Sequence, residues 1–352
     1  MKGCLIIMNY DSAEIRQMPL SVISVKTRAE KFLSRFGLKL DTLDYYAGLF
    51  INDEMVGGGG YEGNIIKCVA IDPEVRGMGL ANILITHLLS RLRADSVQNV
   101  FAFTKPDNKV IFESLSFHTI GESVEAILLE SKRHGISDFI KQLKKSNGVN
   151  GAIVMNCNPF TSGHQYLAEQ AASECDHLYL FVVKEDKSLF PFDVRINLAR
   201  KCTGYLKNVI VCDGGPYIIS SATFPSYFIK EYSYITKAYT ELDIDIFAHH
   251  IAPALNIKKR FAGEEPLDCV TAEYNESMRM ILPQYGILPV IIPRKTAGRM
   301  PVSANYVRHL IGENRINDIK KLVPSYTYDY IVCNKAWLVE KAAQRQLHSK
   351  AI

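Results

Sequence analysis

The second half of the chain alternates short apolar segments with helix-like segments, and this alternation limits the fold more than any other feature. The apolar segments are hydrophobic at consecutive positions, which is typical of strands buried on both faces of a parallel sheet. Helices that alternate with such strands cover the two faces of the sheet. We therefore predict an α/β, Rossmann-like, doubly wound domain. Its expected strands are Ala152–Met155, Leu178–Val183, Val209–Cys212, Ile244–Phe247 and Leu288–Ile292, with helices at Val194–Tyr205 and around Ser226–Tyr239.

The length of 352 residues exceeds that of one typical domain, so two domains are expected. The composition turns polar at Lys141–Gly148, and we place the boundary there, with domains at 1–147 and 148–352. A hydrophobic content of 47% and a charged content of 22% are typical of a globular protein with an ample core. The net charge of +4 does not favour a nucleic acid as partner, although it suits a phosphate site.

The chain shows no sign of a membrane or secretory segment. No stretch approaches the ~18 apolar residues that a membrane helix requires, and the apolar stretch after Met1 is too short for a signal peptide. The eight cysteines are scattered without a C-x-x-C pair, so we expect reduced thiols and neither disulfides nor a zinc site. These patterns predict a cytoplasmic protein with no membrane partner.

The first half reads as a β-meander followed by a helix. Strands are expected at Tyr45–Ile51 and Asn64–Ile71, and an apolar stripe predicts a helix from Leu80 to Leu92. No helix follows the glycine run at 57–60, so a bulged strand is favoured there over a phosphate loop.

Small residues stand where this helix begins. The motif residues are Arg76, Gly77, Gly79 and Ala81. Small side chains let the backbone come close to a ligand, and free N–H groups at a helix start bind pyrophosphate. The motif resembles R/Q-x-x-G-x-G/A of the GNAT acyltransferases, and Phe112–Phe117 resembles their aromatic-x-x-L-G-F segment, with Ser116 in place of glycine. The resemblance implies an N-terminal GNAT-like acyltransferase fold whose cradle binds a CoA-like group.

A second motif follows the first expected strand of the second half. A turn and a helix start after Met155 place a histidine at a helix N-terminus, where the helix dipole favours phosphate. Thr161–His164 has the T/H-x-G-H form of the nucleotidyltransferases, and Val302–Arg308 resembles their I-S-x-S-x-x-R motif with Asn305 in place of a second Ser or Thr. The expected ATP-binding residues are Asn158, Pro159, Phe160, Thr161, Gly163, His164, Ser303, Asn305 and Arg308.

Attack on an α-phosphate requires alignment of the nucleophile and positive charge on the phosphate oxygens. His164, Thr161 and Arg308 are the expected catalytic residues: His164 and Thr161 donate to phosphate oxygens, and Arg308 holds the departing pyrophosphate. Asn158 either contacts a phosphate or fixes the turn. Arg294 and Lys295 are either phosphate ligands or a solvated basic pair.

The expected cofactors are ATP and Mg²⁺, which bridges phosphate oxygens. The histidine pair 249–250 is expected to end a strand at the same face of the sheet, but without a third ligand it does not indicate a protein metal site.

The pairing of a GNAT-like half with a T-x-G-H half resembles the citrate lyase ligase family over nearly the whole chain. The resemblance also includes Glu185–Phe192 with Arg195, Ile251–Ile257, Arg260–Pro266, and Tyr274 with Asn275. From the residues alone, Arg260–Pro266 is a surface loop punctuated by Gly and Pro. The resemblance implies that Gly263, Glu264 and Pro266 form part of the rim over the nucleotide.

The family resemblance implies a ligation in two steps. Acetate attacks the α-phosphate of ATP to give acetyl-AMP and pyrophosphate. The acetyl group then passes to the thiol of the citrate lyase acyl carrier subunit, whose prosthetic group is a phosphoribosyl-dephospho-CoA. The first domain would present this thiol, and the second would make the mixed anhydride.

Three alternatives remain open at this stage. Pro159–His164 also resembles the motif of adenylyltransferases that act on a phosphate acceptor such as phosphopantetheine. The equivalent acetyl ligase of malonate decarboxylase would share the same motifs. A binding module that senses CoA or a nucleotide would bind ATP without turnover.

Overall fold

The computed structural model describes residues 13–185, 187–220, 223–225, 227–229, 232–264, 269–297 and 300–350. The chain divides into two compact units. Unit 1 comprises Met1–Gly135 together with Phe224–Ala238, and unit 2 comprises Ile136–Thr223 and Tyr239–Ile352. A segment from the second half of the chain therefore belongs to unit 1.

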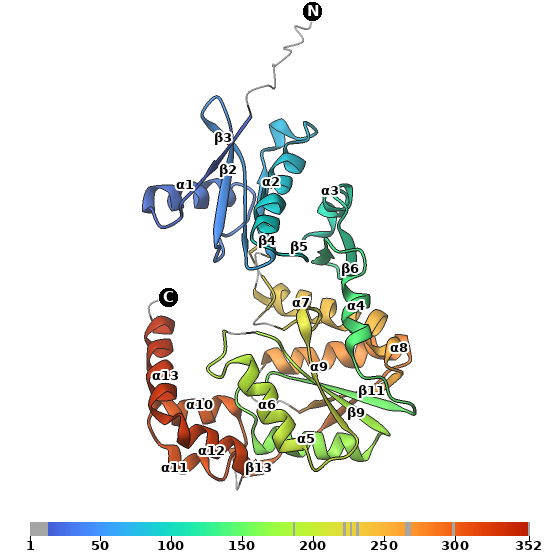
Figure 1. Ribbon diagram of the computed structural model, residues 1–352. Helices are drawn as coiled ribbons and strands as arrows, with labels where there is room; N and C mark the ends of the chain where they lie inside the picture. The colour runs from blue at the N-terminus through green and yellow to red at the C-terminus, as the bar shows by residue number, and fades with distance from the viewer. Residues whose placement is uncertain are drawn as a thin grey trace, which may run out of the picture. The chain divides into compact units, whose positions relative to one another are not determined.

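The described part of unit 1 contains a seven-stranded sheet with the strand order β1-β2-β3-β4-β5-β7-β6 (Figure 1). Strands β4 and β5 are parallel, and the other neighbouring strands are antiparallel. The strands are β1 (Glu14–Gln17), β2 (Tyr45–Ile51), β3 (Glu54–Glu62), β4 (Ile65–Ile71), β5 (Phe101–Thr104), β6 (His118–Glu122) and β7 (Ile127–Glu130). The helices are α1 (Ile23–Ser34), α2 (Leu80–Ala94) and α3 (Lys109–Ser114), with short 3₁₀ turns at Pro73–Val75 and Pro106–Asn108.

The glycine run at 57–60 lies inside β3, as the sequence predicted. The pairing of β3 with β4 shifts register between Gly58 and Gly60, which is the expected bulge. A side chain at Gly60 would collide with the carbonyl oxygen of Tyr45 on β2. The glycines therefore allow close packing of strands and form no phosphate loop.

The described strands of unit 2 form a five-stranded parallel sheet with the order β10-β9-β8-β11-β12. Helix α5 follows β8, and α6 follows β9 (Figure 1). The strands are β8 (Asn150–Met155), β9 (His177–Val182), β10 (Val209–Asp213), β11 (Ile257–Gly263) and β12 (Leu288–Ile292). The helices are α4 (Gly135–Gln142), α5 (Ser162–Ser173), α6 (Phe192–Thr203), α7 (Tyr232–Ile246), α8 (Ala252–Ala254) and α9 (Cys269–Ile281), with short turns at Gly215–Tyr217, Phe247–Ile251 and Leu282–Tyr285. The part of α7 before Tyr239 belongs to unit 1.

Residues that alternate along β8 point into cores on opposite faces of this sheet. Ile153 packs with Ala168 and Ala199 from α5 and α6. Ala152 packs on the other face with Phe247 and Met278. Both faces are buried, which explains the continuous apolar pattern and confirms the predicted doubly wound sheet.

The predicted strand Ile244–Phe247 is wrong. These residues end α7 and begin the π-helical turn at Phe247–Ile251, so the histidine pair 249–250 does not end a strand. The buried residues Ala238, Leu242 and Ile246 are four positions apart, the spacing of one helix face.

The missing strand is β11, in the stretch that the residues alone indicated as a loop. Its charged residues hide the strand pattern. Arg260 is buried in β11 because its guanidinium donates to Asp243 on α7 at 2.9 Å. Of the predicted rim residues, Pro266 lies outside the described residues, as does Asp186 of the loop 185–192.

The C-terminal part of unit 2 is helical and has its own core. Val302 and Val307 pack there with Leu189 and Phe190, which follow β9. Its elements are β13 (Thr296–Ala297), β14 (Met300–Pro301), α10 (Ala304–Gly312), α11 (Ile316–Ile319), α12 (Ser325–Cys333) and α13 (Lys335–Lys350). Every helix in the described ranges is too short or too polar to cross a bilayer.

Candidate active site

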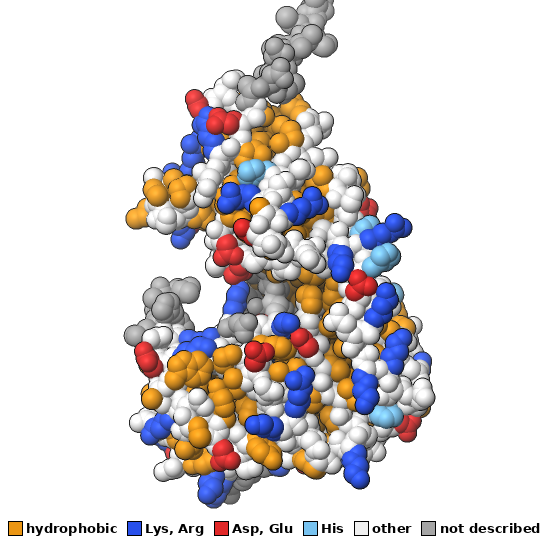
Figure 2. All heavy atoms as spheres, in the orientation of Figure 1, with side chains coloured by type: hydrophobic (Ala, Val, Ile, Leu, Met, Phe, Trp, Pro, Cys, Tyr) orange, Lys and Arg blue, Asp and Glu red, His pale blue; other side chains and the backbone are white. Residues whose placement is uncertain are grey.

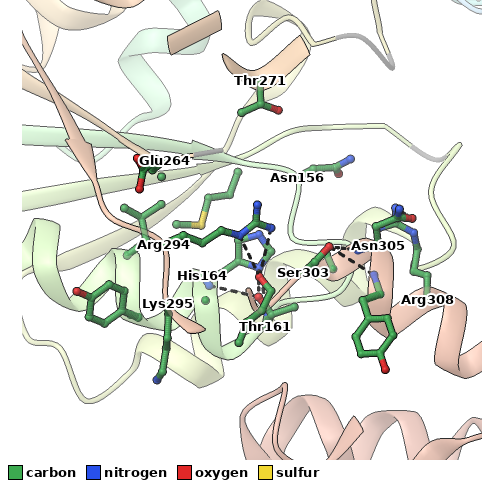
Figure 3. Close-up of a pocket in the computed structure, with 18 of the residues that line it drawn as sticks. Asn156, Thr161, His164, Glu264, Thr271, Arg294, Lys295, Ser303, Asn305 and Arg308 are labelled. Atoms are coloured by element: carbon green, nitrogen blue, oxygen red, sulfur yellow. Dashed lines mark hydrogen bonds between the residues drawn. The ribbon is translucent and has the colours of Figure 1, made fainter. Parts of the chain in front are cut away.

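A cavity of about 1370 Å³ lies at the carboxyl ends of β8, β11 and β12 in unit 2. The order of the strands reverses between β8 and β11, and ligands of doubly wound sheets bind at such a switch point. Helices α5, α10 and α13 supply the other walls. Figure 3 shows side chains from α5, α10 and the ends of the three strands around a common space. The fold thus brings the two predicted motifs to one cavity.

The N-terminus of α5 forms the floor of the cavity. Thr161 caps the helix, because its hydroxyl oxygen accepts from the backbone N–H of His164 at 3.3 Å. In return, the backbone N–H of Thr161 donates to Nδ1 of His164 at 3.0 Å. Since Nδ1 accepts this bond, the neutral imidazole carries its proton on Nε2. His164 therefore presents an N–H donor with a fixed tautomer.

Burial, together with the nearby charges of Arg294 and Arg308, lowers the pKa of His164 to about 4. The imidazole is consequently neutral at pH 7. It can donate a hydrogen bond to a phosphate oxygen but contributes no full charge.

The second motif starts α10. Ser303 caps this helix and accepts from the backbone N–H groups of Asn305 and Tyr306 at 3.2 and 3.4 Å. Arg308 donates to the Asn305 amide oxygen at 3.1 Å and to the carbonyl oxygen of Asn158 at 2.6 Å. This last bond joins the two motifs directly, although they lie 150 positions apart. Two helix N-termini therefore meet at one cavity, an arrangement that favours an anion with several phosphates.

Positive side chains dominate the charged residues that line the cavity. Lys295 stands over the ring of Tyr166 with its ammonium nitrogen 5.9 Å from the ring centroid. Arg294 donates to the carbonyl oxygen of Val302. The charged lining residues are Arg294, Lys295, Arg308, Arg345 and Glu264. The excess of cations suits a polyphosphate.

Six of the nine predicted ATP-binding residues line the cavity: Thr161, Gly163, His164, Ser303, Asn305 and Arg308. The other three, Asn158, Pro159 and Phe160, are not among the residues that line the cavity. Asn158 accepts from the backbone N–H of Phe190 at 3.1 Å through its side chain, so its amide fixes the turn. Phe160 is fully buried in the core beside α5, and Pro159 is buried next to it.

Arg195 on α6 holds the loops around the cavity and is fully buried. Its guanidinium donates to the carbonyl oxygens of Asn156 at 2.7 Å, Val183 at 2.8 Å and Phe190 at 3.0 Å, and also to that of Glu185. The carboxylate of Glu185 lies 3.4 Å away. One side chain thus connects the ends of β8 and β9 with the loop that follows β9.

The sequence did not reveal every lining residue. Gly263 and Glu264 of the predicted rim line the cavity, but Asn156, Thr271 and Arg345 were missed. Arg345 is one of several basic residues on α13, and a helical pattern alone does not show which of them points into a cavity. No group of three or more metal-ligating side chains occurs within the described ranges.

The predicted cradle of unit 1 lies at the start of α2. Gly77 and Gly79 have φ angles of +81° and +73°, which residues with side chains adopt rarely. A β-carbon at either position would meet no atom within 4 Å, so the space over the helix start is open. No side chain caps α2, and Arg76 is exposed beside it. These features fit the cradle for an anionic group that the sequence indicated.

Comparison with known proteins identifies both halves of the chain. Residues 24–111 match the Acetyltransferase (GNAT) family, and residues 150–331 match the Citrate lyase ligase C-terminal domain. A relative from Escherichia coli, named [Citrate [pro-3S]-lyase] ligase, is 42% identical over 313 residues, which cover 86% of this chain and 88% of the relative. A relative of the same name from Haemophilus influenzae is 38% identical over 338 residues, covering 92% and 98%. The predicted fold classes of the two halves are confirmed.

We predict that the His164 imidazole does not titrate between pH 8 and about pH 5, because its pKa is lowered to about 4. In NMR spectra of the ligand-free protein, the resonance lost in His164→Asn should stay at its neutral position over that range. An unfolded histidine binds a proton near its ordinary pKa of 6.5, so stability should fall more in the wild type than in His164→Asn as pH drops from 6.5 towards 4. Titration of this resonance near pH 6.5 would contradict the assigned geometry.

We predict that Arg195→Met lowers the free energy of unfolding of unit 2 by roughly 3–5 kcal/mol, because it removes the guanidinium that Glu185 and several buried carbonyl groups contact. Urea unfolding followed by tryptophan fluorescence measures this change, since the single tryptophan, Trp337, lies in unit 2. Arg200→Met on the same helix is the control, because Arg200 is exposed. Equal effects of the two substitutions would show that Arg195 does not hold the loops.

Proposed function

Since the chain belongs to the citrate lyase ligase family, we propose that it activates acetate with ATP and acetylates a thiol on the citrate lyase acyl carrier subunit. The chain is an enzyme of the ligase class. One observation carries the proposed chemistry: Arg308 on α10 bonds to the carbonyl of Asn158, so the two helix N-termini bearing His164 and Ser303 face one cationic cavity. The relatives bear the citrate lyase name, and this disfavours the phosphopantetheine and malonate decarboxylase alternatives.

In the first step, a carboxylate oxygen of acetate forms a bond to the α-phosphorus, and the bond to the bridging oxygen of the β-phosphate breaks. Negative charge grows on the pyrophosphate as it leaves. The Nε2–H of His164 and the guanidinium of Arg308 would donate to these oxygens. Arg294 and Lys295 add positive charge at the end of β12. The products are acetyl-AMP and pyrophosphate.

In the second step, the carrier thiolate attacks the acyl carbon of acetyl-AMP, and AMP leaves with the electron pair of the broken C–O bond. The thiol proton passes to solvent. An acyl phosphate anhydride is reactive enough that this step makes little demand on a protein base.

Mg²⁺ would reach the cavity on the triphosphate. Magnesium sites commonly combine one or two carboxylates with substrate phosphates and water. Glu264 is the carboxylate among the cavity's lining residues, and this lining fits an ion held mainly by ATP. The ion would neutralise charge on the phosphate oxygens.

Unit 1 would bind the prosthetic group of the carrier. The open start of α2 presents backbone N–H groups beside Arg76, which suits the pyrophosphate of that group. Unit 2 would make the acetyl adenylate, and unit 1 would hold the thiol-bearing substrate. The free thiols of the described cysteines agree with the cytoplasmic setting that we propose for the reaction.

We predict that His164→Asn reduces acetate-dependent exchange of labelled pyrophosphate into ATP by about 10²–10³-fold, the usual loss when one donor to a transition-state oxygen is removed. His249→Asn is the control, because His249 is half exposed on the turn after α7 and bonds to Asp245. Exchange that needs acetate and is lost in His164→Asn alone would support the function. Pyrophosphate exchange that does not need acetate but requires phosphopantetheine would refute the proposed function.

We predict that Gly79→Glu abolishes acetylation of the carrier thiol but leaves pyrophosphate exchange unchanged. The substitution strains a positive φ angle and puts a negative charge at the cradle. Gly63→Glu is the matched control, because Gly63 has a φ of +55° and equally open surroundings in the turn before β4. Equal loss of both steps in Gly79→Glu would contradict the division between the units.

A further inference from the structure

The parallel strands β4 and β5 of unit 1 pair over a short distance and then part. Their ladder contains Ile65 opposite Phe101 and Ile66 opposite Ala102. The far edges of both strands are occupied, since β4 pairs with β3 up to Ile71 and β5 pairs with β7 up to Thr104. The edges that face each other beyond the second rung therefore lack a strand partner, and we call this opening the splay.

Open strand edges can pair with an extended chain that carries amides. A pantetheine arm is an extended chain with two amides. The pyrophosphate cradle at the start of α2 follows the same end of β4, so a CoA-like group bound there could extend its arm into an open splay.

The chain fills the splay with its own segment. The hydroxyl of Tyr227 donates to the carbonyl oxygen of Phe103 on β5 at 2.9 Å. The backbone N–H of Phe101 donates to Asn64 just before β4, and the backbone groups of Phe103, two residues further along β5, face the same side. The Tyr227 hydroxyl therefore lies in the splay. Its own carbonyl accepts from the backbone N–H of Lys39 at 2.9 Å, which fixes the segment to unit 1 from a second side.

Aromatic neighbours of Tyr227 complete the filling. Phe224 packs edge-on against Phe103 with a centroid distance of 5.7 Å, and Phe228 packs against both Phe224 and Tyr227. Phe224, Tyr227 and Phe228 are 7%, 7% and 2% exposed. Burial raises the pKa of Tyr227, so its hydroxyl remains a neutral donor. These three side chains are as buried as core residues, which leaves little room for a second chain.

We infer that the side chains of Phe224, Tyr227 and Phe228 close the splay to a pantetheine arm, so that unit 1 cannot thread an acyl thioester between β4 and β5 and has no acetyl-CoA-dependent transfer of its own. A ligand at the start of α2 is held by its phosphates, and its arm stays outside the sheet. This closure depends on unit 1 alone. Its consequence for the carrier rests on the proposed function: an arm kept out of the sheet leaves the thiol free to meet the acetyl adenylate.

The test compares two probes on the full-length protein by titration calorimetry. Coenzyme A carries the arm, and 3′-phospho-ADP carries the same adenosine and phosphates without it. In the wild type, the two dissociation constants should agree within about twofold, because a closed splay gives the arm no contacts. Coenzyme A that binds about tenfold or more tightly than 3′-phospho-ADP would overturn the inference.

Opening the splay should create affinity for the arm. Phe224→Ala combined with Tyr227→Ala should bind coenzyme A about tenfold or more tightly than the wild type does, with little change for 3′-phospho-ADP. A folded double variant that shows no gain would overturn the inference. Tyr234→Ala is the matched control, because Tyr234 is 46% exposed on α7 in the same segment of unit 1.

The wild-type comparison decides the question even if the double variant does not fold. Acetate-dependent pyrophosphate exchange, measured on the same samples, separates this inference from the proposed function. If the wild type showed no acetate-dependent exchange, the proposed function would be refuted. The coenzyme A titrations would still decide whether the splay is closed.

Discussion

The site in unit 2 depends on the buried guanidinium of Arg195. A charge removed from water is tolerated only where its donors are satisfied, and here four backbone carbonyl groups and the Asn156 side-chain oxygen accept from them, with the Glu185 carboxylate 3.4 Å away. Those carbonyls belong to the residue after β8 and to the loop after β9, which are far apart in the sequence. A lysine would carry the same charge but could not reach so many acceptors in fixed directions.

The positions of both helix N-termini follow from this interaction. Arg195 sets the loop that ends at Phe190, the N–H of Phe190 fixes the side chain of Asn158, and the carbonyl of Asn158 receives Arg308. The turn before α5 and the start of α10 are therefore parts of one hydrogen-bonded chain. Within the resulting cavity, full positive charges come from arginine and lysine, while His164 stays neutral and directs a single N–H. On the face drawn in Figure 2, by contrast, the Lys and Arg side chains of unit 2 are interspersed with acidic and neutral ones.

Much of the site could be predicted because its chemistry is local. A helix start that binds phosphate needs small and hydrogen-bonding residues at fixed spacing, and Thr161–His164 and Ser303–Arg308 show that spacing in the sequence. Two features could not be predicted because they arise from distant contacts. Strand β11 carries lysines and a buried Arg260 whose partner, Asp243, lies on another element, so its pattern does not look like a strand. Arg345 lines the cavity only because α13 folds back beside α10.

The chain leaves unit 1 after Gly135 and returns to it at Phe224–Ala238. The last piece of unit 1 is therefore made only after residues 136–223 of unit 2 have been synthesised. Proteins usually fold from the N-terminus during translation, domain by domain. During synthesis, unit 1 therefore stays incomplete, with its splay unfilled, until the segment Phe224–Ala238 has left the ribosome. Because residues 136–223 of unit 2 precede this segment, unit 1 cannot complete its fold before they have been made.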